Sequence, residues 1–159
     1  MVWLRVLTGD DWALWRDVRL AALAEAPQAF KHRIEDWHRG GEERWRAGFT
    51  SPGTYNIVAF KHDRAVGMAR GIPVGTDVCE LRSVWVSPEA RGRQVGDRMI
   101  EAIAHWALRL GATTLRLTVI PDNHSAIRLY RRHGFAFSGQ LGDALPGGDR
   151  EQVMVKALP

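Results

Sequence analysis

Hydrophobic and polar residues alternate in several short stretches of the chain, and this spacing predicts β-strands. The pattern is clearest where Leu115, Leu117 and Val119 alternate with polar neighbours. A turn at His62-Asp63-Arg64 joins two alternating stretches, which predicts an antiparallel hairpin. The expected strands cover residues 2–7, 55–60, 65–72, 78–86, 113–120, 135–141 and 152–157.

Between the strands, apolar residues recur at helical spacing, and start and stop signals flank these segments. A capping box at Thr8 and Asp11 opens the first helix, and Gly111 and Gly134 follow the last two. The expected helices run from this capping box to Pro27, from Ile34 to Ala47, from Val95 to Leu110 and from Asn123 to His133.

The order of these elements predicts the fold class. Hairpin signals come early, and strands alternate with helices later, which is typical of a mixed α/β protein. We expect a mixed, largely antiparallel central sheet of about six to seven strands, flanked by about four helices. The 159 residues suit one domain, 1–159, in which the Gly-rich stretch 139–148 is interpreted as a loop.

Composition and charge exclude several classes of protein. Lys and Arg number 22 against 18 Asp and Glu, a net charge of +4 that favours anionic partners. The single cysteine, Cys79, excludes an internal disulfide and a Cys-based zinc cluster, and we expect it to pack. No apolar run approaches the roughly 20 residues of a membrane helix, and no secretory signal is visible. We therefore expect a soluble, cytoplasmic protein that binds no membrane.

The segment between strand 78–86 and the next helix has the features of an anion site. It reads Arg91-Gly92-Arg93-Gln94-Val95-Gly96 and leads into a helix, whose first N–H groups suit a phosphate. The glycines allow close approach of the backbone, and the arginines add charge. The spacing is neither a Walker motif nor Gly-x-Gly-x-x-Gly. The alternative is a basic surface loop that caps a helix.

Two segments together resemble the GNAT superfamily of acyl-CoA-dependent N-acetyltransferases. The strand Glu80–Val86 followed by Arg91–Gly96 is similar to the family's pyrophosphate loop, Gln/Arg-x-x-Gly-x-Gly/Ala. The segment Asn123–Phe135 is similar to its Asn-x-x-Ala-x-x-x-Tyr-x-x-x-Gly-Phe pattern. Gln94 stands where the family has its central glycine, and its Cβ restricts φ and crowds the pyrophosphate.

The resemblance implies a GNAT fold, acetyl-CoA as co-substrate, no metal, and acetyl transfer to a primary amine by direct attack. Backbone groups of Val84 and Val86 would hold the acetyl carbonyl and the pantetheine arm, and Tyr130 would protonate the departing thiolate. Asn123 would contact the pantetheine or simply cap its helix, and the alternative for Tyr130 is a core aromatic. The implied cofactor-binding residues are Val84, Trp85, Val86, Arg91, Gly92, Arg93, Gln94, Val95, Gly96 and Asn123.

Glu80 is the candidate general base. It lies roughly 13 Å along the strand from Val84, at about 3.3 Å per residue and with the same side-chain parity, so the proton would leave through water. The alternative is a salt bridge with Arg82 or Arg70. The weaker candidates for a base are His32, His38 and His62.

The acceptor is expected to lie against the first two helices and the segment Ser138–Gly148. Four carboxylates could attract a cationic amine, with solvated surface charge as the alternative: Glu35, Asp36, Asp143 and Asp149. The protein is expected to be a monomer or a homodimer.

Two other functions stay open at this point. A non-catalytic acyl-CoA sensor is suggested by Gln94. A nucleic-acid-binding module is suggested by Arg128, Arg131 and Arg132 on one short helix, but Gly134-Phe135 and a strand follow that helix directly, which argues against such a module. We therefore expect no nucleic-acid partner.

Overall fold

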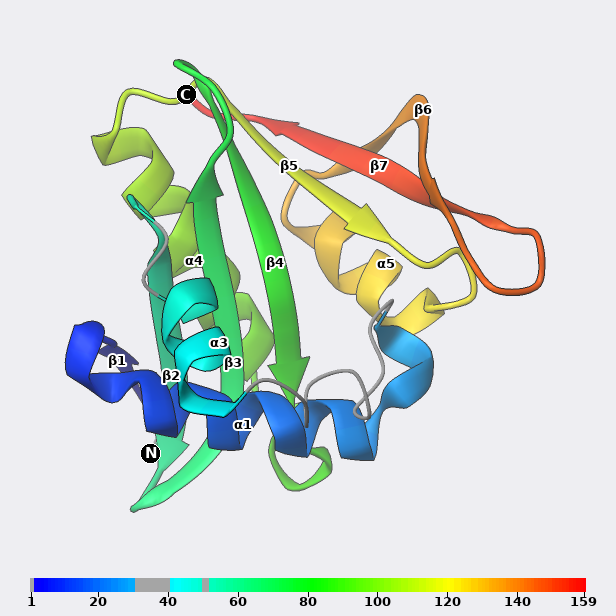
Figure 1. The fold of residues 1–159 in the computed structure, drawn as a ribbon. Helices are drawn as coiled ribbons and strands as arrows, with labels where there is room; N and C mark the ends of the chain where they lie inside the picture. The colour runs from blue at the N-terminus through cyan, green and yellow to red at the C-terminus, as the bar shows by residue number, and fades with distance from the viewer. Residues whose placement is uncertain (1, 31–40, 50–51) are drawn as a thin grey trace.

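A computed structural model describes residues 2–30, 41–49 and 52–159 (Figure 1). These residues form one seven-stranded sheet in the order β1-β2-β3-β4-β5-β7-β6. Its strands are β1 Val2–Val6, β2 Tyr55–Lys61, β3 Arg64–Pro73, β4 Val78–Val86, β5 Thr114–Val119, β6 Ala136–Ala144 and β7 Arg150–Ala157. Neighbours pair antiparallel except β4 and β5, which are parallel. The predicted mixed, largely antiparallel sheet is confirmed.

Helices cover both faces of this sheet (Figure 1). The described α-helices are α1 Trp12–Glu25, α3 Gly41–Phe49, α4 Val95–Arg109 and α5 His124–Arg132. Three single 3-10 turns accompany them: η1 Gly9–Asp11, η2 Pro27–Ala29 and η3 Pro88–Ala90. No helix in the described ranges is both long and apolar enough to cross a membrane.

Two hydrophobic cores lie on the two faces. The first packs α4 and α5 against the sheet and buries Ile103, Leu115 and Leu117. The second packs α1 and α3 against the other face and includes Trp15 and Trp85. Each large apolar side chain buried in this way contributes about 1.5–3 kcal/mol, so both layers hold the sheet firmly.

The first helix begins and ends as its sequence signals predict. The Asp11 carboxylate accepts a hydrogen bond from the Thr8 backbone N–H at 2.8 Å, which is the reciprocal half of the capping box. The box opens η1, and α1 follows directly. Helix α1 ends at Glu25, and Pro27 begins η2. Proline is well suited to this first position of a turn because it lacks an N–H group.

The second helix extends further than predicted. Helix α3 continues through Gly48 to Phe49, while the expected start at Ile34 lies outside the described residues. Phe49 is 3% exposed and its ring lies 6.1 Å from that of Trp15 on α1. The burial of this aromatic ring offsets the cost of a glycine in the last turn.

The strand predicted at 135–141 forms but extends further than expected. Strand β6 runs to Ala144, so the stretch 139–148, interpreted as a loop, is strand as far as residue 144. Leu141 pairs with Gln152 and Ala144 with Arg150, through an irregular register. Pairing with β7 overrides the low strand propensity of the glycines here.

Candidate active site

The parallel pair at the centre of the sheet is short, and the two strands then separate (Figure 1). Strand β4 pairs with β5 only from Val78 to Glu80, opposite Thr114 to Arg116, within the described residues. A cavity of about 1210 Å³ occupies the opening, lined by both strands, the start of α4, α5 and the turn after α1. One backbone edge of β4 therefore faces this cavity and no neighbouring strand.

A β-bulge interrupts β4 beside the cavity. Its register with β3 jumps from Met68↔Trp85 to Arg70↔Arg82, so two residues of β4, 83 and 84, lie opposite one residue of β3. Ser83 has φ +58°, a left-handed conformation that costs a non-glycine residue about 1 kcal/mol or more. Bulges redirect side chains, and this one lies where the strands part.

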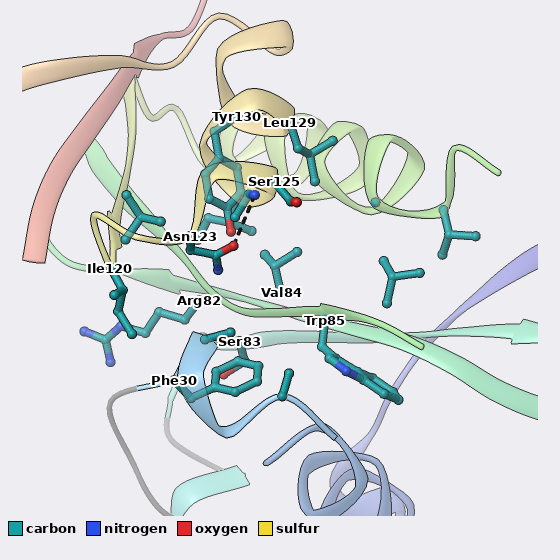
Figure 2. Close-up of a pocket in the computed structure, with 18 of the residues that line it drawn as sticks. Phe30, Arg82, Ser83, Val84, Trp85, Ile120, Asn123, Ser125, Leu129 and Tyr130 are labelled. Carbon is teal, nitrogen blue, oxygen red and sulfur yellow. Dashed lines mark hydrogen bonds between the residues drawn. The ribbon is translucent and has the colours of Figure 1, made fainter. Parts of the chain in front are cut away.

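The bulge reverses the side-chain alternation of β4. The α4-side core includes Cys79, with Val84 and Val86 packed against it. An unbroken strand would place Cys79 and Val84 on opposite faces of the sheet. Trp85 packs in the α1-side core instead. Figure 2 shows Val84 and Trp85 pointing to opposite sides of the strand. Glu80 is the neighbour of Cys79 in the strand and so points to the opposite, α1 side of the sheet. The prediction that Glu80 and Val84 share a face was therefore wrong.

Helix α5 contributes two side chains to the cavity wall. Figure 2 shows Tyr130 and Asn123 directed toward the same space as Val84. The Asn123 Oδ1 atom accepts a hydrogen bond from the Ala126 N–H at 3.3 Å, so Asn123 caps α5 and also lines the cavity. Tyr130 is 8% exposed and edge-on to Phe135, and burial raises its pKa well above the usual value.

The loop before α4 turns through two residues in the left-handed conformation. Gly92 has φ +76°, and Gln94, which precedes the helix, has φ +64°. The position where the family carries glycine thus requires a left-handed residue, and Gln94 adopts this conformation at a cost of about 1 kcal/mol. A Cβ on Gly96 would lie 2.9 Å from Leu129 of α5, so the glycine allows the two helices to approach.

The two loop arginines differ in their surroundings. The Arg91 Nε atom donates to the Val86 carbonyl at 3.0 Å, and its guanidinium pairs with Glu25 of α1. The same carboxylate accepts from Trp85 Nε1 at 3.0 Å, so Arg91 joins the loop to β4 and α1. Arg93 is exposed and lies outside the described cavity lining. The other predicted site residues, Glu80, Val84, Trp85, Val86, Arg91, Gly92, Gln94, Val95, Gly96, Asn123 and Tyr130, all line the cavity.

Glu80 lies at the closed end of the opening and is held by two arginines. It is 6% exposed; one carboxylate oxygen accepts from Arg82 Nε, and the other accepts from Arg116 Nε at 3.1 Å and Nη2 at 2.8 Å. The ion pair with Arg82 is the alternative expected from the sequence. Arg70 is not its partner and donates to Asn56 Oδ1 at 2.6 Å. The role of Glu80 as a base stays a prediction.

The remaining candidate bases and carboxylates lie in different places. His62 is exposed in the β2–β3 turn and Asp143 lines the cavity, whereas Asp149 is exposed outside its described lining. The predicted candidates that fall outside the described residues are His32, His38, Glu35 and Asp36. In the part of the chain that the structure describes, no three His, Cys, Asp or Glu side chains gather as a metal site requires.

Several residues in or near the cavity were not predicted from the sequence, among them three charged ones. Arg116 neutralises Glu80, and Glu151 on β7 is 8% exposed and lines the cavity. Arg19 on α1 lines it too, and burial, with Arg70 as a second cause, lowers the pKa of Arg19 to about 10. One signal was available for Glu151, because it shares the spacing of two with Val153 and Val155 and so takes a position expected to be apolar.

Comparison with known proteins places this architecture in a family. A family model described as "Acetyltransferase (GNAT) family" matches residues 15–135. Streptothricin acetyltransferase of Streptomyces lavendulae is 30% identical over 156 residues, which cover 96% of this chain and 79% of that protein. L-2,4-diaminobutyric acid acetyltransferase of Nocardia farcinica is 28% identical over 138 residues, 83% of this chain and 65% of that protein. An uncharacterized N-acetyltransferase of Schizosaccharomyces pombe is 30% identical over 76 residues, and the match covers 47% of its length.

Solved structures share the fold over the full chain. An acetyltransferase of the GNAT family from Streptococcus pneumoniae superposes with a TM-score of 0.82 at 19% identity, covering 100% of both chains. The structure of yncA, a putative acetyltransferase from Salmonella typhimurium solved with acetyl-CoA, gives 0.76 at 17% identity and covers 100% of this chain and 95% of that one. Because the family match covers residues 15–135 and the Streptomyces relative is 30% identical over 96% of this chain, the chain belongs to the acetyltransferase (GNAT) family.

Proposed function

We propose that this protein is an N-acetyltransferase that moves the acetyl group of acetyl-CoA to a primary amine by direct attack. The observation that carries the proposal is the open edge of β4 at the bulge, which faces a cavity large enough for an extended ligand. The family membership and the acetyl-CoA bound in the related Salmonella structure support the choice of donor.

The backbone of β4 would hold the reacting end of acetyl-CoA. Pairing with β3 fixes the strand on one side, so its groups on the other side are preorganised. An N–H directed at the thioester oxygen stabilises the charge that develops there, typically by a few kcal/mol. We assign this role to the backbone at Val84 and contact with the pantetheine arm to Val86. Because Arg91 already donates to the Val86 carbonyl, this arginine would share or leave that contact when acetyl-CoA binds.

The start of α4 would hold the pyrophosphate. Backbone N–H groups of Gln94, Val95 and Gly96 lie at a helix N-terminus, where the partial positive charge of the helix suits an anion. The left-handed residues Gly92 and Gln94 turn the loop so that it leads into this terminus. Arg91 and Arg93 add positive charge nearby, from inside and outside the cavity lining respectively.

Proton transfer would involve Tyr130 and Glu80. Because burial raises the pKa of Tyr130, the phenol stays protonated throughout the ordinary assay range and can donate to the thiolate of the departing CoA. Glu80 would accept the proton of the amine through water. Cys79 is 2% exposed on the α4 side, which supports direct attack and not an acyl-cysteine route.

The experiment that tests this proposal combines binding and turnover. Acetyl-CoA should raise the melting temperature more than pantetheine does, because only the former carries the phosphates that the loop would hold. A panel containing L-2,4-diaminobutyrate, L-lysine, spermidine, a short peptide and an aminoglycoside is then screened for thiol release and for acetylated product by mass. Stabilisation without release for any amine would instead identify a non-catalytic acyl-CoA sensor.

A further inference from the structure

Glu151 is a buried carboxylate whose charge no described side chain balances. It lies on β7, is 8% exposed and lines the cavity. Among residues 2–30, 41–49 and 52–159, no hydrogen bond or ion pair reaches its side chain. Its oxygens are not among the described polar atoms sealed in the interior without a partner, so they open onto the cavity.

The two buried carboxylates of the cavity therefore differ in what they can bind. Both oxygens of Glu80 are engaged by Arg82 and Arg116. Those of Glu151 remain available. Burial of an unpaired carboxylate reduces stability, and buried charges in proteins are as a rule paired or bound to a ligand. An unpaired carboxylate in a cavity wall is therefore suited to a ligand of opposite sign.

Glu151 also faces the side of the sheet on which room is left for an acceptor. Leu117 and its partner Met154 belong to the α4-side core, so by alternation Glu151 points to the α1 side, as Glu80 does. The α4 side is taken by the proposed pyrophosphate loop. An amine that approaches from the α1 side would meet Glu151 on one wall of the opening and β4 on the other.

A glycine keeps space free beside this carboxylate. A Cβ on Gly142 of β6 would lie 3.2 Å from the Glu151 Cβ and 3.6 Å from its Oε1. It would also lie 3.6 Å from Cγ2 of Thr118 on β5. A larger residue at 142 would crowd the carboxylate, so β5, β6 and β7 together form a small recess around it.

We propose that Glu151 binds an ammonium group of the acceptor, so that the acceptor is an aliphatic amine that is cationic in solution. Carboxylate oxygens accept charge-assisted hydrogen bonds from ammonium groups, whereas a neutral aromatic amine offers no charge to the site. This inference rests on the proposed acetyltransferase function and specifies its substrate class.

The test compares the parent with Glu151→Gln, which keeps the shape and removes the charge. Glu43→Gln on the exposed surface of α3 is the matched control. For each protein, melting is measured alone, with acetyl-CoA, and with L-2,4-diaminobutyrate, L-lysine or spermidine in the presence of CoA. The KM and kcat for each of these amines are measured by thiol release, and aniline serves as the neutral probe.

We expect Glu151→Gln to melt at or above the parent temperature, because no ion pair is lost, and to keep the full acetyl-CoA shift. The KM for the cationic amines should rise about tenfold or more, the usual effect of losing a charged hydrogen bond. Stabilisation by these amines should fall, and Glu43→Gln should behave as the parent. Gly142→Ala, which keeps the charge but narrows the recess, should raise the same KM.

Three results would overturn the inference. One is an unchanged KM and amine shift in Glu151→Gln, and another is a melting temperature of Glu151→Gln clearly below those of the parent and Glu43→Gln, which would mark Glu151 as structural. The third is a parent that binds acetyl-CoA but neither binds nor acetylates any cationic amine of the panel. The change in melting temperature caused by acetyl-CoA tests the proposed function separately. If acetyl-CoA causes no change while amines still stabilise the parent and not Glu151→Gln, the ammonium site is supported and the acetyltransferase proposal fails.

Discussion

The two halves of the cavity differ in the kind of group that lines them: backbone in one half and side chains in the other. The half assigned to acetyl-CoA consists of backbone groups at the edge of β4 and at the start of α4, which follow each other closely in the sequence. The other half consists of side chains such as Arg19, Glu80 and Glu151, which come from α1, β4 and β7. Arg116 of β5 holds Glu80 from outside the described lining. A short motif can specify the first half, whereas only the complete sheet brings the second together. Variants in the two halves should therefore fail in different ways.

The largest effect is expected at Tyr130, between the halves. Tyr130→Phe keeps the ring against Phe135 and removes only the hydroxyl, so folding and acetyl-CoA binding should survive. We expect kcat to fall about ten- to a thousand-fold, because the thiolate loses its proton donor. Steady-state kinetics with an acetyl-CoA melting curve measures both. Normal turnover in this variant would make Tyr130 a core residue of the first half and nothing more.

Glu80→Gln should mainly affect stability. The substitution leaves Arg82 and Arg116 without their common carboxylate, and we expect a loss of about 2 kcal/mol, moderated because both arginines are partly exposed. Chemical denaturation measures it. The exposed pair of Glu42 and Arg46 supplies a control, since Glu42→Gln should cost about 0.5 kcal/mol or less.

The pH dependence of turnover separates the two roles of Glu80. If it accepts the proton of the amine, the rate deficit of Glu80→Gln should shrink as the pH rises and more of the amine is already neutral. A deficit that is the same at every pH would assign Glu80 to holding the second half together.

The smallest effect is expected in the backbone half, at Gln94. Gln94→Gly should relieve the left-handed strain and stabilise the protein by about 0.5–1 kcal/mol, with acetyl-CoA binding equal or tighter. Gly92→Ala, which introduces the same kind of strain at φ +76°, should lose a similar amount. Denaturant unfolding and calorimetric titration measure the two quantities. Weaker acetyl-CoA binding in Gln94→Gly would show that the glutamine side chain itself contacts the cofactor.

The sequence predicts the helices and strands well where periodicity and caps agree. Helix α4 has one apolar stripe from Met99 to Trp106 and a glycine after its end, and it forms as expected. Strand β6 extends beyond its predicted end at residue 141, because its pairing with β7 outweighs the glycines at 139 and 142. Local pattern therefore fails where a distant strand determines the outcome.

In the site, the missed features have one physical cause. The bulge at Ser83 carries no glycine, so nothing in the alternation of β4 announces that the side chains change face there. Arg116 and Glu151 lie within ordinary strand patterns, and only the register of β4, β5 and β7 brings them to the cavity. The position of Tyr130 and of most of the loop Arg91–Gly96 at the cavity was predictable, because each belongs to a short motif of contiguous residues, although Arg93 lies outside the described lining.

The three residue pairs that join β4 to β5 also have a mechanical consequence. Strands β1 to β4 form one antiparallel block and β5 to β7 another, and in the described sheet the parallel seam between them has fewer paired residues than any other pair of neighbouring strands. Such a seam is where local opening should be easiest, and amide exchange should be fastest along the cavity edge of β4. A ligand bound between the strands would contact both blocks and stabilise the closed seam. Amide exchange should then slow in the sheet on both sides of the cavity, and not only at the residues that touch the ligand.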